Sequence, residues 1–192
     1  MTLFLIGLVL FLGSHLVRAL APHVRQSLAS RLGETGYRAA HAIVSLLALC
    51  LLIYGFGEAR AETGILYNPP VGLRHLAMLL VLIAFIVLAS GFLPTGYIAR
   101  FAKHPQVLAI KIWAFAHLLA NGETAQVILF AAFLAWGVIL RISYKRRAAR
   151  GEVVERQFRS WTWDIVAVVA GVVVYGIFAM KLHELLIGVP VM

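Results

Sequence analysis

The sequence predicts an all-α protein, a polytopic bundle of six transmembrane helices with both termini outside the cytoplasm. Three observations lead to this prediction. Of the 192 residues, 62% are hydrophobic and 13% are charged, whereas a soluble domain is usually about 45–50% apolar and about 25% charged. Six apolar segments are long enough to cross a bilayer. The loops between them alternate between basic and neutral or acidic.

The six apolar segments fill one predicted transmembrane domain over residues 1–192. They lie at about residues 3–20, 38–57, 72–93, 105–121, 123–140 and 163–187. A helix of about 17–25 residues spans a hydrocarbon core that is about 30 Å thick. The first segment has no positive residue before its apolar run, so we expect a retained helix rather than a signal peptide.

The charges of the loops predict the orientation of the chain. The loops near residues 21–38, 94–104 and 141–162 carry more Arg and Lys than Asp and Glu. The loops near residues 58–71 and 121–123 are neutral or acidic. Because basic loops stay on the cytoplasmic side of a membrane, the first, third and fifth loops are expected there. Both termini then lie on the opposite side.

Local residues support these boundaries. Pro22 is expected to close the first helix and Pro94 to end the third. Asn121-Gly122 is typical of a helix stop followed by a turn. Asp164 falls in the first turn of the sixth helix, where a carboxylate favours the helix dipole.

Small side chains within the apolar segments are expected to pack against other helices. Cys50 is the single cysteine and cannot form an intramolecular disulfide, so we expect a small buried hydrophobe. Gly171 and Gly176 in the sixth helix allow another helix to approach closely. The sequence leaves open whether that helix belongs to the same chain or to a second copy.

Several classes of function are excluded by composition and motif. The formal charge of +9 is explained by cytoplasmic loops of a membrane protein, so we expect no nucleic-acid partner. The sequence has no zinc pattern of paired cysteines. It also has no Ser-His-Asp arrangement, no paired carboxylates and no phosphate-binding loop, so no catalytic residue is assigned.

The fourth apolar segment, HPQVLAIKIWAFAHLLANG, is unusually polar for its depth. Ionisable groups inside a membrane are candidates for function. As a helix, it places Trp113, His117 and Asn121 on one face at spacings of four residues, and His104 and Lys111 on another. The two histidines are then about 20 Å apart along the axis, so at most one of them belongs to any given site.

His15 and His117 are the histidines expected deepest in the membrane. Such a ring is satisfied either as a ligand of haem iron or by a hydrogen bond to another helix. His15 is expected within about 10 Å of the cytoplasmic side and His117 about 20 Å from it. His41, near the cytoplasmic start of the second helix, matches the depth of His15 better. Both pairings stay open.

Other polar and aromatic side chains have two interpretations each. Lys111 either extends its amine toward the cytoplasmic interface or pairs with a haem propionate, a part that Arg18 is also placed to play. Trp113 and Trp136 either line a flat cofactor or simply pack in the bundle.

Five stretches of the chain resemble one known family. They are GLVLFLGSHLVRALAP, RLGETGYRAAHAIVSLLAL, YNPP, HPQVLAIKIWAFAHLLANGE and LFAAFLAWGVILRISYKRR. The chain resembles the NnrU family of bacterial membrane proteins along nearly its whole length, most specifically over residues 104–147. The resemblance implies a multi-pass protein of the bacterial inner membrane, with its termini in the periplasm. It further implies an association with nitrite and nitric oxide reduction in denitrification, with other nitrogen-oxide respiratory proteins as partners.

The same motifs are similar to plant zeta-carotene isomerase, a plastid membrane protein with haem b. That similarity implies His15 and His117 as the axial ligands of a haem b, with His104 at the position of the histidine in the HP motif. Ala114 departs from the pattern, because the plant enzyme has there a cysteine proposed as an alternative ligand. The resemblance therefore implies haem more readily than isomerisation.

Three functions follow as hypotheses. The first is a haem b protein that supports nitrogen-oxide metabolism. The second is a haem-dependent isomerase of a polyene or lipid. The third is a membrane scaffold without a cofactor.

Overall fold

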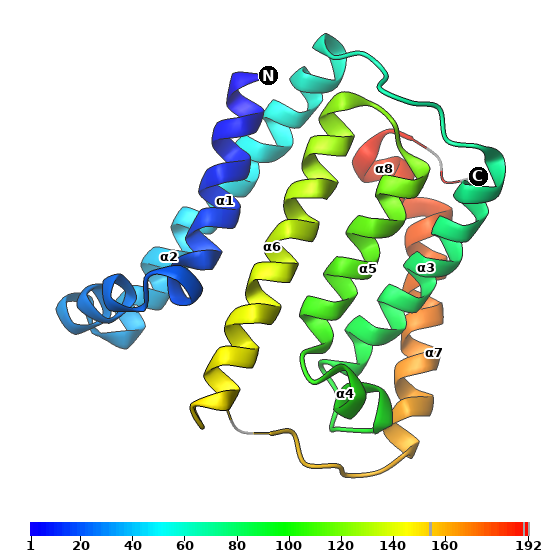
Figure 1. Cartoon of the computed structure of the whole chain (residues 1–192). Coiled ribbons are helices and arrows are strands. Elements are labelled where there is room, and N and C mark those ends of the chain that lie inside the picture. Colours follow the sequence, from blue (N-terminus) through cyan, green and yellow to red (C-terminus); the bar gives the residue numbers. More distant parts are fainter. Residues whose placement is uncertain (154, 190, 192) are drawn as a thin grey trace. The chain divides into compact units, whose positions relative to one another are not determined.

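The computed structural model describes residues 1–153, 155–189 and 191. Within these residues the chain is helical, with one isolated bridge between Ile65 and Glu123 and no strand. The prediction of an all-α fold is confirmed. The helices, labelled in Figure 1, are α1 (Thr2–Leu20), α2 (Pro22–Glu62), α3 (Val71–Ser90), α4 (Tyr97–Ala102), α5 (Pro105–Ala120), α6 (Thr124–Ala149), α7 (Thr162–Ile177), the π-helical η1 (Phe178–Leu182) and α8 (His183–Ile187).

Five helical stretches are long and apolar enough to cross a membrane. They are Thr2–Leu20, Pro22–Glu62, Val71–Ser90, Thr124–Ala149 and Thr162–Leu185. The chain therefore has the character of a multi-pass membrane protein, as predicted. Helix α5 is also apolar, but it has 16 residues. At 1.5 Å per residue it is about 24 Å long, which is shorter than the hydrocarbon core of about 30 Å.

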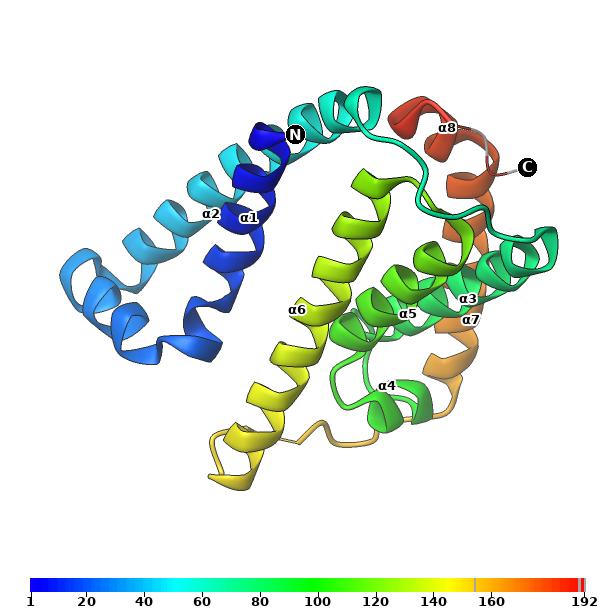
Figure 2. The same ribbon diagram turned by 45° about the horizontal axis from the view of Figure 1, so that its top comes forward.

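Helix α2 reaches far beyond the predicted segment at residues 38–57. Pro22 closes α1 as expected, but it also begins a new helix, because its fixed φ suits the first helical position. Gly33 then interrupts the helix with φ 73° and ψ 160°, a conformation that suits glycine. The predicted first loop is therefore largely a helical arm, residues 22–32, which Figure 2 shows bent away from residues 34–62.

Two further boundaries differ from the prediction, and one short helix was not predicted. Helix α3 ends at Ser90, three residues early, with Gly91 at its C-cap. Helix α6 continues to Ala149 rather than ending at residue 140. Its last turns are rich in Lys, Arg and Ala, which favour helix although they are not apolar. Helix α4 was not predicted, because the sequence places residues 97–102 in a loop.

The chain forms two compact units. Unit 1 comprises Met1–Pro69 and Asn121–Arg146, and thus α1, α2 and most of α6. Unit 2 comprises Pro70–Ala120 and Arg147–Met192, and thus α3, α4, α5, α7, η1 and α8.

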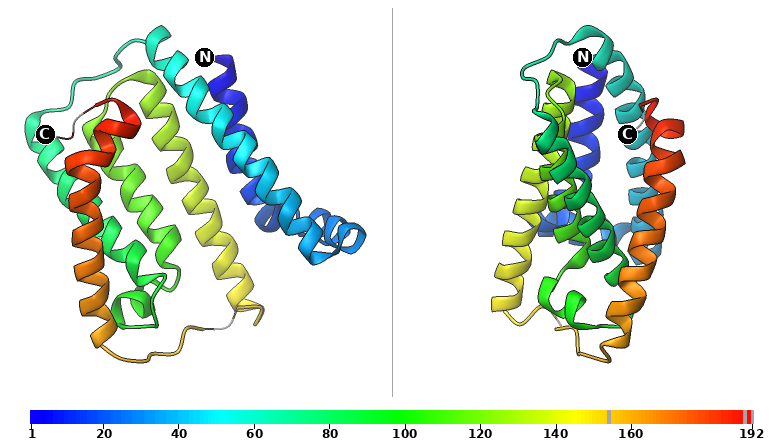
Figure 3. Two further views of the ribbon diagram at one scale, coloured as in Figure 1. Left: turned by 180° about the vertical axis from the view of Figure 1, so that it is seen from behind. Right: turned by 90° about the vertical axis from the view of Figure 1, so that its right-hand side faces the viewer.

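In unit 1, α1 runs antiparallel to the second arm of α2, as Figures 1 and 3 show. Glycine lets the two backbones meet. A Cβ on Gly7 would lie 2.6 Å from the backbone nitrogen of Leu52, and a Cβ on Gly55 would collide with the backbone of Phe4. The core of unit 1 consists of Phe4, Leu8, Leu12, Leu52, Ala59 and Ala125, and aromatic residues of α6 pack against it.

Cys50 departs from the expected buried position, because it is exposed on α2. The buried face of this arm is formed by Ala48, Leu52, Gly55 and Ala59 instead. These four positions recur at helical spacing, whereas Cys50 falls outside that stripe. In an apolar span, the side facing lipid is as hydrophobic as the core, so the apolar run alone does not reveal which residues are buried.

In unit 2, α3 packs against both α5 and α7. Gly171 of α7 is buried against α3, where an added Cβ would lie 2.6 Å from Cα of Ile86. This close approach is within the chain. At Gly176, an added Cβ would meet no atom of another described part of the chain within 4 Å.

Substitution by alanine should therefore affect the stability of the protein differently at the two glycines of α7. We expect Gly171→Ala to lower the stability by about 1–3 kcal/mol, because backbone blocks the new methyl group. Gly176→Ala should leave the stability unchanged or raise it by about 0.5–1 kcal/mol, because alanine favours helix. Thermal unfolding of the purified protein in detergent measures the difference. Equal midpoints for the two variants would contradict this packing.

Candidate functional site

The antiparallel pairing of α1 and α2 brings two histidines together in unit 1. The ring centres of His15 and His41 are 5.1 Å apart, and the rings meet edge to face at 75°. Both rings are partly buried. The sequence left the pairing of His15 with His41 open on grounds of depth, and the structure places these two rings in contact.

The orientation of His15 is fixed by its own helix. Its Nδ1 lies 2.7 Å from the carbonyl oxygen of Phe11, one turn earlier. A carbonyl oxygen only accepts hydrogen bonds, so Nδ1 carries the proton and donates it. In the neutral ring the lone pair is then on Nε2, the form in which histidine binds a metal.

Aromatic side chains surround the histidine pair. Phe11 lies 4.7 Å from His15 between ring centres, and Trp136 of α6 lies 6.3 Å from it. Tyr37 lies 6.1 Å from His41 on the other side. The pair is therefore held in an aromatic setting built from α1, α2 and α6. Sequence reasoning named Trp136 as a candidate, but it did not find Phe11 or Tyr37, which carry no polar signal at membrane depth.

Two polar atoms in the same unit are buried without a hydrogen-bond partner among the described residues. They are Oγ of Ser45, one turn after His41 on α2, and the indole Nε1 of Trp136. Leaving a buried donor unsatisfied costs about 1–3 kcal/mol. Such donors suit a site that receives a polar group from a ligand or a water molecule.

In unit 2, His117 has the same ring orientation as His15. Its Nδ1 lies 2.9 Å from the carbonyl oxygen of Trp113, and the two ring centres are 5.0 Å apart. This bond again puts the proton on Nδ1. Trp113 and His117 therefore lie on one face of α5, as their spacing of four residues predicts.

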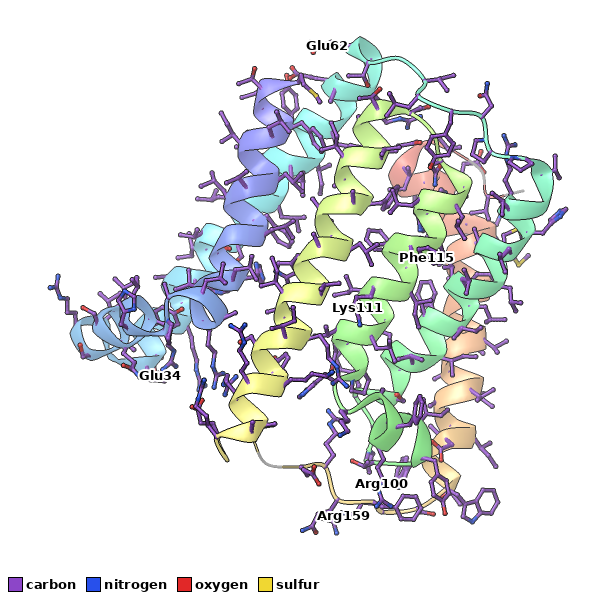
Figure 4. All side chains as sticks on the ribbon, viewed as in Figure 1. Glu34, Glu62, Arg100, Lys111, Phe115 and Arg159 are labelled. Carbon is purple, nitrogen blue, oxygen red and sulfur yellow. The ribbon has the colours of Figure 1, made fainter. Side chains whose placement is uncertain are left out.

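The remaining candidate residues lie on or beside α5, except for Arg18, which lies on α1. His104 precedes α5, and its carbonyl oxygen accepts the first hydrogen bond of the helix from Leu108. Lys111 is half-buried on α5, where Figure 4 labels it. Asn121 directly follows the last residue of α5, in agreement with its predicted role as a helix stop. Arg18 is exposed in the last turn of α1.

Each of the two deep histidines, taken within its own unit, has the kind of nitrogen donor that a haem iron would need. His15 and His117 both hold the tautomer that an axial ligand requires. His15 and His41 meet edge to face with their ring centres 5.1 Å apart, so this arrangement leaves no room for a flat cofactor between the two rings. Among the described residues, no group of three or more His, Cys, Asp or Glu side chains suits another metal ion.

The carboxylate of Asp164 has a role that the sequence did not reveal. Asp164 lies in the first turn of α7, as predicted. Its two oxygens accept hydrogen bonds from the backbone nitrogens of Tyr97 and Ile98, at 2.7 and 2.8 Å. These nitrogens begin α4, so a residue 66 positions away caps that helix. Gly96 makes room, because a Cβ there would collide with the carboxylate.

We expect the loss of this cap to loosen α4. Asp164→Asn leaves one acceptor oxygen for two backbone donors and should cost about 1–3 kcal/mol. Trypsin cleavage after Arg100 and Lys103 in membranes should accelerate accordingly. Glu155→Gln is the matched control, because Glu155 is exposed and makes no ion pair among the described residues. Equal cleavage rates in the two variants would contradict the capping role.

Comparison with known proteins identifies the family of this chain. A family model described as NnrU protein matches residues 3–191. The match covers nearly the whole chain and includes every histidine discussed above. No curated protein and no solved structure matches the chain.

Proposed function

Because this chain belongs to the NnrU family, we propose that it is an inner-membrane haem b protein that supports nitrite and nitric oxide metabolism. The observation that carries the haem proposal is the shared orientation of His15 and His117. Each ring donates through Nδ1 to a carbonyl oxygen one turn earlier, at 2.7 and 2.9 Å. Second-sphere bonds of this kind orient histidine ligands and increase their basicity.

The proposed ligands are His15 and His117, and the remaining candidates have supporting roles. Trp113 and Trp136 would pack beside their respective histidines, at the ring distances given above. Lys111 and Arg18 would pair with the propionates. A bound haem would supply an iron centre that exchanges electrons or binds a diatomic ligand. The protein residues would hold the axial nitrogens in place and keep the surroundings apolar.

Hemin titration of the purified protein tests this proposal. We expect the wild type to take up hemin with the absorption spectrum of a bis-histidine haem. His15→Ala and His117→Ala should each lower the hemin affinity at least about tenfold. Loss of a residue that only orients a ligand already costs about this much, and loss of the ligand itself should cost no less. His23→Ala is the matched control, because His23 is exposed on the helical arm of α2. A protein that binds no hemin would favour a scaffold without a cofactor.

We further propose six membrane crossings with both termini in the periplasm. The support is the charge of the connecting segments together with the apolar character of α5, which is added to the five longer stretches. Residues beside α5, namely His104 before it and Asn121 and Gly122 after it, would complete its crossing. The even number of crossings keeps both ends of the chain on one side.

Cysteine labelling tests the orientation. In a Cys50→Ala background, we expect Ala61→Cys to react with a membrane-impermeant maleimide in intact cells. Arg31→Cys should react only after the cells are broken open. Both positions are exposed; Ala61 lies in the last turn of α2, and Arg31 lies beside the interruption at Gly33. Figure 4 labels Glu34 near this interruption and Glu62 at the C-terminal end of α2. The reverse labelling pattern would contradict the proposed orientation.

A further inference from the structure

Two segments of unit 2 that are distant in the sequence are tied together at one end of its helices. Residues 91–104 connect α3 to α5, and residues 155–161 precede α7. The backbone nitrogen of Arg159 donates to the carbonyl oxygen of Thr95 at 2.8 Å, and the guanidinium of Arg156 donates to that of Gly91 at 3.0 Å. The rings of Tyr97 and Phe158 are 4.6 Å apart between centres. Together with the Asp164 cap, these contacts hold both segments in one place.

The joined segments present cations that form no ion pair among the described residues. Arg100, Lys103 and Arg159 are exposed, and none of them makes an ion pair within the described part of the chain. Figure 4 shows Arg100 and Arg159 at the same end of unit 2. Of the two nearby carboxylates, that of Asp164 is occupied by backbone donors and that of Glu155 points to solvent. The local charge is therefore positive, because the cations Arg100, Lys103, Arg156 and Arg159 outnumber the two carboxylates.

Large aromatic side chains are exposed on the same two segments. Phe101 is 88% exposed, Phe92 77%, Trp161 60% and Tyr97 59%. Aromatic rings of this kind are costly in water but favourable at the level of lipid headgroups. We call this set of cations and rings the basic–aromatic face. It consists of Phe92, Tyr97, Arg100, Phe101, Lys103, Phe158, Arg159 and Trp161.

The place of the basic–aromatic face on the helices indicates which kind of molecule it binds. Its segments begin where α3 ends and finish where α7 begins, and both of these helices are long and apolar enough to cross a bilayer. The face therefore lies at the ends of two helices that are able to cross a bilayer. Aromatic rings favour the membrane–water interface. Lys and Arg side chains beside them are attracted to the negative headgroups of anionic lipids.

We propose that the basic–aromatic face binds the headgroups of anionic phospholipids. The phosphate and its negative headgroup pair with Arg100, Lys103 and Arg159, while Phe101, Tyr97 and Trp161 insert beside the acyl chains. The Asp164 cap and the Arg159–Thr95 bond hold the cations in place before lipid binds. This site is independent of the haem proposal, because none of its residues is a proposed haem ligand.

Quenching of tryptophan fluorescence by brominated lipids tests the proposal on the full chain. The protein is reconstituted in phosphatidylcholine vesicles that contain a small, equal fraction of brominated phosphatidylglycerol or brominated phosphatidylcholine. We expect the brominated phosphatidylglycerol to quench the wild type more strongly, and Trp161→Phe to remove most of that difference. Equal quenching of the wild type by the two lipids would overturn the proposal.

Charge variants show whether the named cations cause the preference. Each Lys or Arg near an anionic surface contributes roughly a fivefold gain in affinity. Arg100→Gln with Arg159→Gln should therefore lower the preference for phosphatidylglycerol more than about tenfold. Arg100→Lys with Arg159→Lys should retain most of it.

The matched control is Arg31→Gln with Lys145→Gln, which removes from unit 1 two exposed cations that form no ion pair among the described residues. We expect this control to retain the preference, and an equal loss in both pairs would overturn the proposal. A preference abolished by inorganic phosphate, but not by sodium chloride of equal ionic strength, would assign the face to a soluble phosphate ligand and also overturn it.

Discussion

In each unit, a glycine lets the backbone of one helix lie directly against another helix. Gly7 of α1 faces Leu52 of α2, and Gly171 of α7 faces Ile86 of α3. Lipid tails are as apolar as the helices, so helices in a bilayer associate through such van der Waals contact rather than through the hydrophobic effect. The contact at Gly7 also sets the register of α1 against α2. About two turns further along, that register brings His15 level with His41.

Much of the helical fold was predictable, because an apolar run and a turn signal are local properties of the sequence. The start of α5 at Pro105 and its stop at Asn121-Gly122 follow from neighbouring residues. The helical arm at residues 22–32 and the end of α6 were missed because charged and polar residues form helices that hydropathy does not detect. Helix α4 was missed for another reason, since its cap comes from Asp164 on a distant helix.

The candidate site divides in the same way. The shared face of Trp113 and His117 and the ring orientation of His117 depend on one helix turn, so the spacing of four residues was sufficient to indicate them. The contact between His15 and His41 depends on how two helices pack, and depth alone made it one of two open pairings. The unsatisfied donors of Ser45 and Trp136 had no signal in the sequence, because they arise only when three helices assemble.

The fit between Gly96 and Asp164 links two positions that are far apart in the chain. The carboxylate occupies the space that a side chain at position 96 would need, and it satisfies backbone donors that lie next to that position. Neither residue can change freely while the other stays. Within the NnrU family, these two positions are therefore expected to co-vary, so that lineages with a bulkier residue at the first have lost the acid at the second.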